Sequence, residues 1–141
     1  MYSSEFGKIW LKLLKEYKQH MDNRLAPTLT DAQLTVLEVL TEREAMKPSE
    51  LIPYLSTSAA AVTMLLDRME KNGLISRERD SADRRLVWVS ITDTGREETE
   101  RGLRIRNEFF AGALDHISAH NQQLLLYLMG KLVAVPEPAG T

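Results

Sequence analysis

The chain has 141 residues, 43% of them hydrophobic, so it is long enough for one domain with a buried core and is not a disordered tail. Cysteine is absent, which excludes disulfides, thiolate metal sites and a thiol redox switch. The net charge of −2 counts against DNA binding unless basic residues gather on one face. No apolar run is long enough to cross a bilayer and no signal-peptide pattern opens the chain, so we expect a cytoplasmic protein without a membrane partner.

The first part of the chain has the spacing of two amphipathic helices. Residues 5–22 place apolar side chains at three- and four-residue steps. A connector containing Pro27 follows, and Thr30 is suited to cap a second helix that ends near Arg43. Both segments therefore predict helices with one apolar face.

A helix-turn-helix pattern comes next. Pro48 suits the first position of a helix, but Pro53 lies beyond the first four donors and should kink it, so we expect a short or 3₁₀-like element. A turn and cap at 56–58 then lead into a helix over 59–72, which Gly73 closes. The apolar stripe expected on this helix comprises Ala59, Val62, Leu65, Leu66 and Met69.

The most informative stretch is 74–95. Residues 86–91 alternate apolar and polar side chains as a strand does, 74–79 form a facing arm, and 80–83 have the short polar side chains of a turn. Arg84 and Arg85 follow the tip. A helix, a glycine stop and an arginine-tipped hairpin are the layout of a winged helix-turn-helix, which points to duplex DNA as the partner.

Charge is distributed unevenly along the chain. The segment from 68 to 85 is locally positive although the whole chain is negative. Its basic residues are Arg68, Lys71, Arg77, Arg79, Arg84 and Arg85, against Glu70, Glu78, Asp80 and Asp83. A small DNA-binding face on an otherwise acidic dimer would need this asymmetry.

The last third of the chain predicts two more helices. Thr92 or Asp93 caps a long charged helix that runs to about Ile117, and 119–133 form a final amphipathic helix before a frayed tail at 135–141. The predicted fold class is therefore mostly α with a small β-hairpin wing, in the order α-α-α-α-β-β-α-α. The amphipathic first and last helices have little to pack against except each other, which suggests dimerisation through the termini.

Three motifs resemble the MarR family of bacterial regulators: Met69–Arg77, Asp83–Arg84–Arg85 and Ile91–Gly95. The resemblance covers essentially the whole chain and implies one MarR-like domain over 1–141. Its dimerisation helices would be 5–22 and 96–134, and its winged helix-turn-helix lobe 30–92. It also implies a homodimer whose recognition helices enter successive major grooves of a pseudo-palindromic operator. Members are commonly repressors released by phenolic, anionic or aromatic ligands or by oxidation, and a cysteine route to oxidation is missing here.

The wing supplies the first group of candidate DNA contacts. The functional interpretation is that Arg85 enters a narrow minor groove, held by Asp83, while Arg84 reaches a phosphate. The alternative is a solvated hairpin tip with a weak surface ion pair, and which arginine reads the groove stays open. Arg77 and Arg79 on the first arm are candidate phosphate contacts, although charged strand faces are common.

The helix over 59–72 supplies the second group. Candidates for phosphate or base contact lie at its start and on its exposed face: Ser56, Thr57, Ser58, Ala60, Thr63, Met64 and Arg68. Plain capping is the alternative for the hydroxyls, and pairing with Asp67 or Glu70 is the alternative for Arg68. Family members often have a long basic residue where Met64 stands, so we expect apolar contacts, such as those to thymine methyls, and reading of DNA shape.

The aromatic residues, methionine and histidines give weaker indications of a binding site. A ligand cavity for a small aromatic or anionic molecule could be lined by Trp10, Tyr17, Met21, Tyr54, Phe109 and Phe110, although such residues usually form core. Trp88 is expected to pack the wing onto the lobe. The histidines, His20, His116 and His120, are expected to be solvated, with no metal and no cofactor.

No catalytic constellation is visible, since the chain has no glycine-rich phosphate loop, no HExxH and no nucleophile motif. The sequence therefore predicts a homodimeric, sequence-specific DNA-binding regulator, more often a repressor than an activator. The alternative is a winged helix used as a protein-interaction module without its own operator. A small-molecule enzyme is a third class, but no residues support it.

Overall fold

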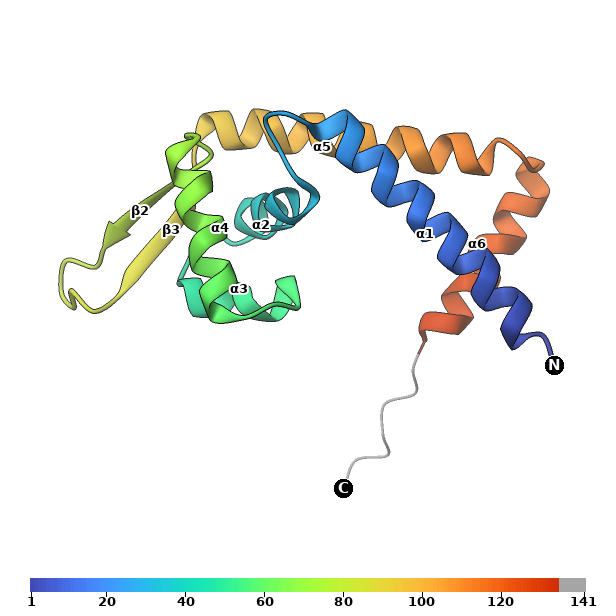
Figure 1. The fold of residues 1–141 in the computed structure, drawn as a ribbon, viewed down its shortest axis with the longest axis horizontal. Helices are drawn as coiled ribbons and strands as arrows, with labels where there is room; N and C mark the ends of the chain where they lie inside the picture. Colours follow the sequence, from blue (N-terminus) through green and yellow to red (C-terminus); the bar gives the residue numbers. More distant parts are fainter. Residues whose placement is uncertain (135–141) are drawn as a thin grey trace, which may run out of the picture. The chain divides into compact units, whose positions relative to one another are not determined.

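The computed structural model describes residues 1–134, so the predicted fraying of 135–141 lies outside the described residues. Within that range the chain has six helices and a small three-stranded sheet (Figure 1). The elements are α1 Ser3–Leu25, α2 Asp31–Glu42, β1 Ala45–Met46, α3 Pro48–Leu55, α4 Ala59–Lys71, β2 Ile75–Arg79, β3 Val87–Ile91, α5 Asp93–Leu114 and α6 Ala119–Val133. The chain divides into two compact units, Met1–Arg106 and the residues from Asn107 onward.

The first two helices begin and end close to where the sequence predicts. Thr30 caps α2 because its hydroxyl accepts a hydrogen bond from the Gln33 backbone N–H at 3.2 Å. The Gln33 side chain returns the bond, accepting from the Thr30 N–H at 3.1 Å. This capping box satisfies two N–H groups that the helix itself leaves free.

The third helix follows one of the two predicted alternatives. It is short, as expected, but α-helical over Pro48–Leu55 rather than 3₁₀-like, with Pro53 in its interior. The hydrogen bond that Pro53 cannot donate leaves the carbonyl of Ser49 unpaired within the helix, and Ser49 is exposed so that water can reach it. An eight-residue helix therefore tolerates the proline.

The fourth helix buries a narrower stripe than predicted. Val62, Leu66 and Met69 are buried and Leu65 is half-buried, but Ala59 is exposed. The prediction for Ala59 was wrong because the buried stripe starts only after the first turn of the helix.

The sheet contains a strand that the sequence pattern did not predict. Its order is β1-β3-β2, with all pairs antiparallel, and β1 pairs Ala45 with Ser90 and Met46 with Val89. Two residues are too short to produce an alternating pattern. Met46 is nevertheless buried, so β1 attaches the base of the hairpin to the helical core.

One apolar core in the first unit joins the helices to the sheet. Its members come from every helix of that unit and from all three strands. They are Met21, Leu25, Leu29, Leu34, Val36, Leu37, Leu40, Met46, Leu51, Val62, Leu66, Met69, Leu74, Ile75, Val89 and Ile105. Burying this set holds α4 and the hairpin in one rigid lobe.

Polar contacts connect α1 and α2 to α5. Arg106 donates to the Tyr17 hydroxyl at 3.1 Å and forms an ion pair with Glu38. His20 is half-buried, and its Nε2 lies 2.9 Å from the carbonyl oxygen of Ile105. The prediction of a solvated histidine was wrong for His20 because α5 packs over that side of α1.

The second unit consists of the end of α5 and α6. The Ser118 hydroxyl caps α6 by accepting from the Asn121 N–H at 3.2 Å. The preceding helix ends at Leu114, three residues before the predicted end, and the Gln122 amide donates to the Leu114 carbonyl at 2.9 Å. A side chain from α6 thus satisfies a carbonyl that the end of α5 leaves free.

No helix within residues 1–134 is long and apolar enough to span a membrane.

Replacing Gly95 by alanine is expected to destabilise the protein. An added Cβ would overlap the carbonyl oxygen of Leu74 and come within 2.7 Å of the Ile91 side chain. Overpacking of this kind costs about 1–3 kcal/mol, and here the obstacle is backbone. Urea unfolding at fixed protein concentration measures the loss.

Gly112→Ala is the matched control on the same helix, because nothing lies within 4 Å of its added Cβ. It should leave stability unchanged or raise it by up to about 1 kcal/mol through helix propensity. Equal stability of the two variants would contradict the close approach of α5 to Leu74.

Candidate nucleic-acid interface

The candidate interface begins at the turn between α3 and α4. Ser56 ends α3 in the left-handed region, with φ 47° and ψ 42°. Two residues later Ser58 caps α4, its hydroxyl accepting from the Ala61 N–H at 3.2 Å. The predicted turn and cap are confirmed, and Ser58 is the capping residue.

The helix that follows has one buried and one exposed face. Ala60, Thr63, Met64 and Arg68 are all exposed, as the sequence predicts, and 61% of the Met64 surface is accessible. The Thr63 hydroxyl donates to the Ala59 carbonyl at 3.1 Å. The exposed side chains of the first two turns are therefore mainly apolar.

An arginine braces the hairpin against this helix. Arg77 of β2 forms ion pairs with two carboxylates of α4, at 2.7 Å to Asp67 and 3.1 Å to Glu70. The hydrogen bond from Arg77 lowers the pKa of Glu70, and these bonds raise the pKa of Arg77. Within residues 1–134 both carboxylates pair with Arg77, and no ion pair joins either of them to Arg68. The Arg77 guanidinium therefore forms its ion pairs within the lobe.

The loop at the tip of the hairpin is organised by one carboxylate. Asp80 accepts from the Ala82 and Asp83 backbone N–H groups at 2.8 and 3.0 Å, and from the Trp88 indole N–H at 2.9 Å. The Trp88 bond is the largest cause of the lowered pKa of Asp80, and the two backbone bonds act in the same direction. The Asp80–Trp88 bond was not predicted, since nothing in the spacing distinguishes Asp80 from the other polar residues of the turn.

The predicted pair at the wing tip is present. The Asp83 carboxylate accepts from Nε and one terminal nitrogen of Arg85, each at 3.0 Å. It also accepts from the Arg85 backbone N–H at 3.1 Å. This pairing lowers the pKa of Asp83, yet the Arg85 side chain is 90% exposed. Arg85 is thus oriented while its cation still faces solvent.

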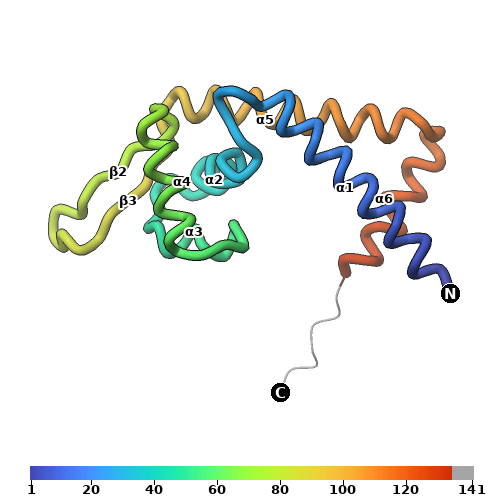
Figure 2. The backbone as a smooth tube through the Cα atoms, in the orientation of Figure 1, coloured from blue at the N-terminus to red at the C-terminus, as the bar shows by residue number. Residues whose placement is uncertain are grey.

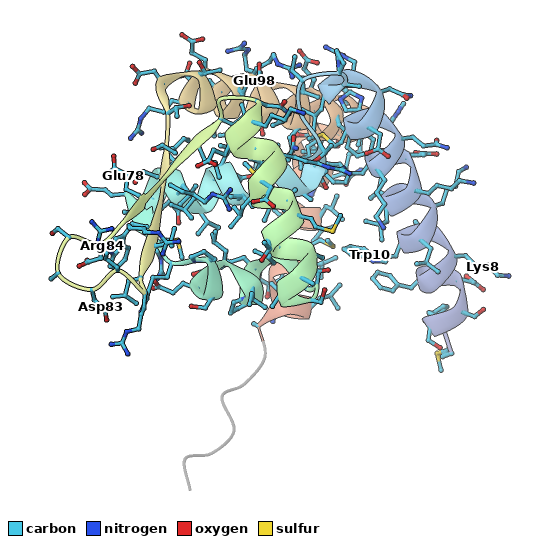
Figure 3. All side chains as sticks on the ribbon, turned by 60° about the vertical axis from the view of Figure 1, so that its left-hand side comes forward. Lys8, Trp10, Glu78, Asp83, Arg84 and Glu98 are labelled. Atoms are coloured by element: carbon cyan, nitrogen blue, oxygen red, sulfur yellow. The ribbon has the colours of Figure 1, made fainter. Side chains whose placement is uncertain are left out.

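The other two wing arginines differ from Arg85. Arg79 donates to the Arg84 carbonyl at 2.8 Å, so it supports the loop from the end of β2. Figure 3 shows Asp83 and Arg84 in the loop at the tip, beyond Glu78 on β2. Arg84 is exposed, and within residues 1–134 no hydrogen bond or ion pair holds its guanidinium.

The hairpin base is closed by Thr92. Its hydroxyl donates to the Gly73 carbonyl at 2.6 Å and accepts from the Gly95 N–H at 3.0 Å. It therefore caps α5, as predicted, and also bonds the glycine that follows α4. Figure 2 shows the end of α4 beside the start of α5. Gly73 has φ +77°, a conformation that favours glycine at the end of a helix.

The local charge balance is explained by these contacts. The carboxylates of Asp67, Glu70 and Asp83 are paired with arginines, and Asp80 is hydrogen-bonded within the loop. The exposed basic side chains are Arg68, Lys71, Arg79, Arg84 and Arg85. The described lobe thus presents cations on α4 and on the wing, while most neighbouring carboxylates are bonded to other groups of the lobe.

The candidate ligand residues differ in their surroundings within the described residues. Met21 is fully buried in the core, Tyr17 bonds Arg106, Trp10 stacks on Phe6, and Tyr54 is 43% exposed. An open pocket of about 340 Å³ in the first unit is lined by other residues: Pro27, Thr28, Asn72, Leu74, Thr94 and Glu98. Phe109 and Phe110 contact each other edge to face in the second unit. Within residues 1–134 no group of three potential ligands could hold a metal ion.

Comparison with known proteins agrees with this geometry. Residues 29–87 match the model of the MarR family. The chain is 31% identical to the transcriptional repressor MdtR of Bacillus subtilis over 109 residues, which are 77% of this chain and 70% of MdtR. The chain belongs to the MarR family. It is a transcriptional regulator of the winged helix-turn-helix type.

Solved structures of MarR-family proteins share the fold. YusO of Bacillus subtilis is 27% identical with a TM-score of 0.78, over 95% of this chain and 93% of YusO. The reduced form of MarR from E. coli is 25% identical with a TM-score of 0.79, over 90% of this chain and 95% of MarR. A MarR mutant complexed with operator DNA has a TM-score of 0.73 at 23% identity, over 94% of this chain and 98% of that one.

The Asp80–Trp88 bond predicts a pH-dependent indole signal. Because the pKa of Asp80 is lowered in the folded protein, this bond stabilises the wing above the pKa of an unstructured aspartate and is lost as pH falls through the folded value. We expect the Trp88 indole N–H resonance in a ¹⁵N–¹H spectrum to move with a midpoint below the ordinary pKa of an aspartate. The Trp10 indole resonance is the internal control.

Asp80→Asn should abolish this movement, because the amide no longer titrates. An identical pH response of the Trp88 signal in Asp80→Asn would assign the titration to another group and contradict the bond.

Proposed function

We propose that this regulator is a sequence-specific double-stranded-DNA-binding repressor that binds a pseudo-palindromic operator as a homodimer. The observation that carries the proposal is the exposed guanidinium of Arg85 at the tip of the wing. It is oriented by the two hydrogen bonds that it donates to the Asp83 carboxylate, and Arg77 holds the wing to α4. A cation that is oriented before binding loses little side-chain entropy when it enters a minor groove.

The relatives support this proposal. MdtR is named a transcriptional repressor, and the E. coli MarR mutant that shares this fold was crystallised with operator DNA. By the same relationship we propose 1–141 as a single MarR-like domain, with 30–92 as the DNA-binding lobe and 5–22 and 96–134 as dimerisation helices. Regulation of bacterial transcription would place the protein in the cytoplasm, without catalytic activity.

We assign roles within the interface from geometry and charge. The exposed face of α4 enters the major groove, where Ala60, Thr63 and Met64 contact base edges. Phosphate contacts come from the start of α4 and from exposed cations: Ser56, Thr57, Ser58, Arg68, Arg79 and Arg84. Arg77 positions the wing through its ion pairs and does not contact phosphate. Binding should weaken with salt because phosphate neutralisation releases counterions.

The terminal helices support the homodimer. No α6 residue is buried within the described chain. Large apolar side chains are exposed on both terminal helices: Phe6, Ile9, Trp10, Leu11, Leu13, Leu14, Leu124, Leu125, Leu126, Tyr127, Leu128, Leu132 and Val133. Monomeric proteins rarely expose apolar surfaces of this extent, and a second copy of the chain would cover them.

We also propose that a small aromatic or anionic ligand releases the operator. Such a ligand must bind the DNA-free arrangement of the dimer more tightly than the DNA-bound one, since equal affinity for both would shift nothing. Trp10, Tyr17, Met21 and Tyr54 stay the candidate residues, and Tyr17 is the best placed because its hydroxyl bonds a cation, Arg106.

Arg85→Ala should weaken operator binding by about 1–3 kcal/mol, or about 5- to 150-fold in Kd. The physical reason is the loss of the one wing cation that the structure orients outward. A gel-shift titration measures it, with the DNA upstream of the gene and excess non-specific competitor at two salt concentrations.

Arg104→Ala is the matched control, since Arg104 is an exposed arginine of α5 outside the proposed DNA-binding lobe 30–92. It should change Kd by less than about twofold. If the two variants bind equally well, the wing role of Arg85 is excluded. If even the wild type forms no competitor-resistant complex with genomic DNA, the protein-interaction module replaces the proposed function.

Leu125→Glu and Leu128→Glu together should convert the dimer to a monomer that no longer binds the operator. Burying two carboxylates in an apolar interface costs more free energy than the contacts of that interface contribute. Analytical ultracentrifugation measures the mass, and circular dichroism confirms that the helices persist. Gln123→Glu, an exposed polar position of the same helix, is the control and should stay dimeric. A dimeric double variant would show that α6 is not at the interface.

A further inference from the structure

The first two turns of α4 offer few hydrogen-bonding groups to a DNA base. Residues 59–64 read Ala-Ala-Ala-Val-Thr-Met, so the first charged residue of the helix is Asp67. Asp67 is paired with Arg77. The side chains that commonly discriminate bases by bidentate bonds are arginine, lysine, asparagine and glutamine, and this face has none of them.

The hydroxyls on this helix are largely used within it. Thr63 donates its proton to the Ala59 carbonyl, and Ser58 accepts from the Ala61 N–H as the helix cap. Reading a base with the Thr63 hydroxyl as donor would require breaking the first of these bonds. Without rearrangement Thr63 offers its methyl group and the acceptor side of its hydroxyl, and neither can donate a hydrogen bond to a base.

Apolar groups on this face follow helical spacing. Ala60 and Met64 are four residues apart and Thr63 is three after Ala60, so all three share the side opposite the buried Val62 and Leu66. Met64 is 61% exposed, so a polar residue at this position would not disturb the core. A flexible thioether adapts to irregular apolar surfaces.

We propose that this face, Ala60, Thr63 and Met64, reads the C5 methyl groups of thymines in the major groove of each half-site. The inference rests on the proposed function and names the chemical feature by which it selects its operator. The C5 methyl is the one apolar group in the major-groove pattern and distinguishes thymine there from the other bases. Arg85 and the phosphate contacts then supply affinity, while methyl contacts supply sequence preference.

The test starts with selection of the preferred site from random duplexes by the full-length protein. Deoxyuridine, which lacks only the C5 methyl, then replaces thymidine at each position of that site in turn. We expect a loss of about fourfold in affinity for each methyl in contact, within two half-sites about one helical turn apart. Thymidines between the half-sites are controls for altered DNA shape and should change affinity by less than about 1.5-fold.

Matched protein variants assign the contacts. Thr63→Ser keeps the hydroxyl and removes the methyl, whereas Thr63→Val keeps the methyl and removes the hydroxyl. Thr63→Val should retain the sensitivity to deoxyuridine, and Thr63→Ser and Met64→Ala should each lose it at one thymidine of each half-site. The salt dependence of binding should be unchanged, because no phosphate contact is altered.

The outcomes separate two failures. If no duplex is enriched by selection, the proposed function fails and the inference falls with it. If a site is enriched but uniform deoxyuridine substitution leaves its affinity unchanged, the inference is overturned while the proposed function stands. The inference is also overturned if Thr63→Val loses binding and Thr63→Ser keeps it, since the hydroxyl would then read the base.

Discussion

The contact between the start of α5 and the end of α4 determines how the two DNA-reading elements are held. Gly95 approaches the Leu74 backbone so closely that a Cβ would not fit, and Thr92 bonds the Gly73 carbonyl and the Gly95 N–H at once. The recognition helix, the base of the hairpin and the long helix therefore meet at one point. A small displacement of α5 must move α4 and the wing with it, because this junction leaves no free space to absorb it.

Four carboxylates of the wing and of α4 hold the wing in place through contacts within the lobe. Asp80 organises the loop, Asp83 orients Arg85, and Asp67 and Glu70 hold Arg77 against α4. Exposed ion pairs of this kind add little to stability. Their effect is on geometry, and they leave cations facing outward on a chain whose net charge is −2. An acidic protein can in this way present a basic interface.

Under the proposed function the exposed apolar surface would have two roles. The large leucine and aromatic side chains of α1 and α6 would lie in an interface that a second copy covers, whereas the small apolar patch on α4 would contact a few base edges. Both surfaces are unfavourable in an isolated protomer, because exposing apolar area to water costs free energy. Dimerisation and DNA binding would each remove one of them.

Much of this protein follows from local pattern. The 3.6-residue spacing, Thr30 and Thr92 as caps, Gly73 as a stop and the alternation over 86–91 are properties of neighbouring residues, and they predict the helices, the hairpin and the exposed face of α4. The Asp83–Arg85 pair spans two residues and was predicted for the same reason. Contacts between distant residues had no such signal: β1, the bonds of Trp88 and Arg77, and the burial of His20 depend on which elements pack together. Local spacing determined which elements form and which residues they expose, and only tertiary packing decided which charged groups stay available for DNA, because each pairing requires two elements to be brought within hydrogen-bond distance.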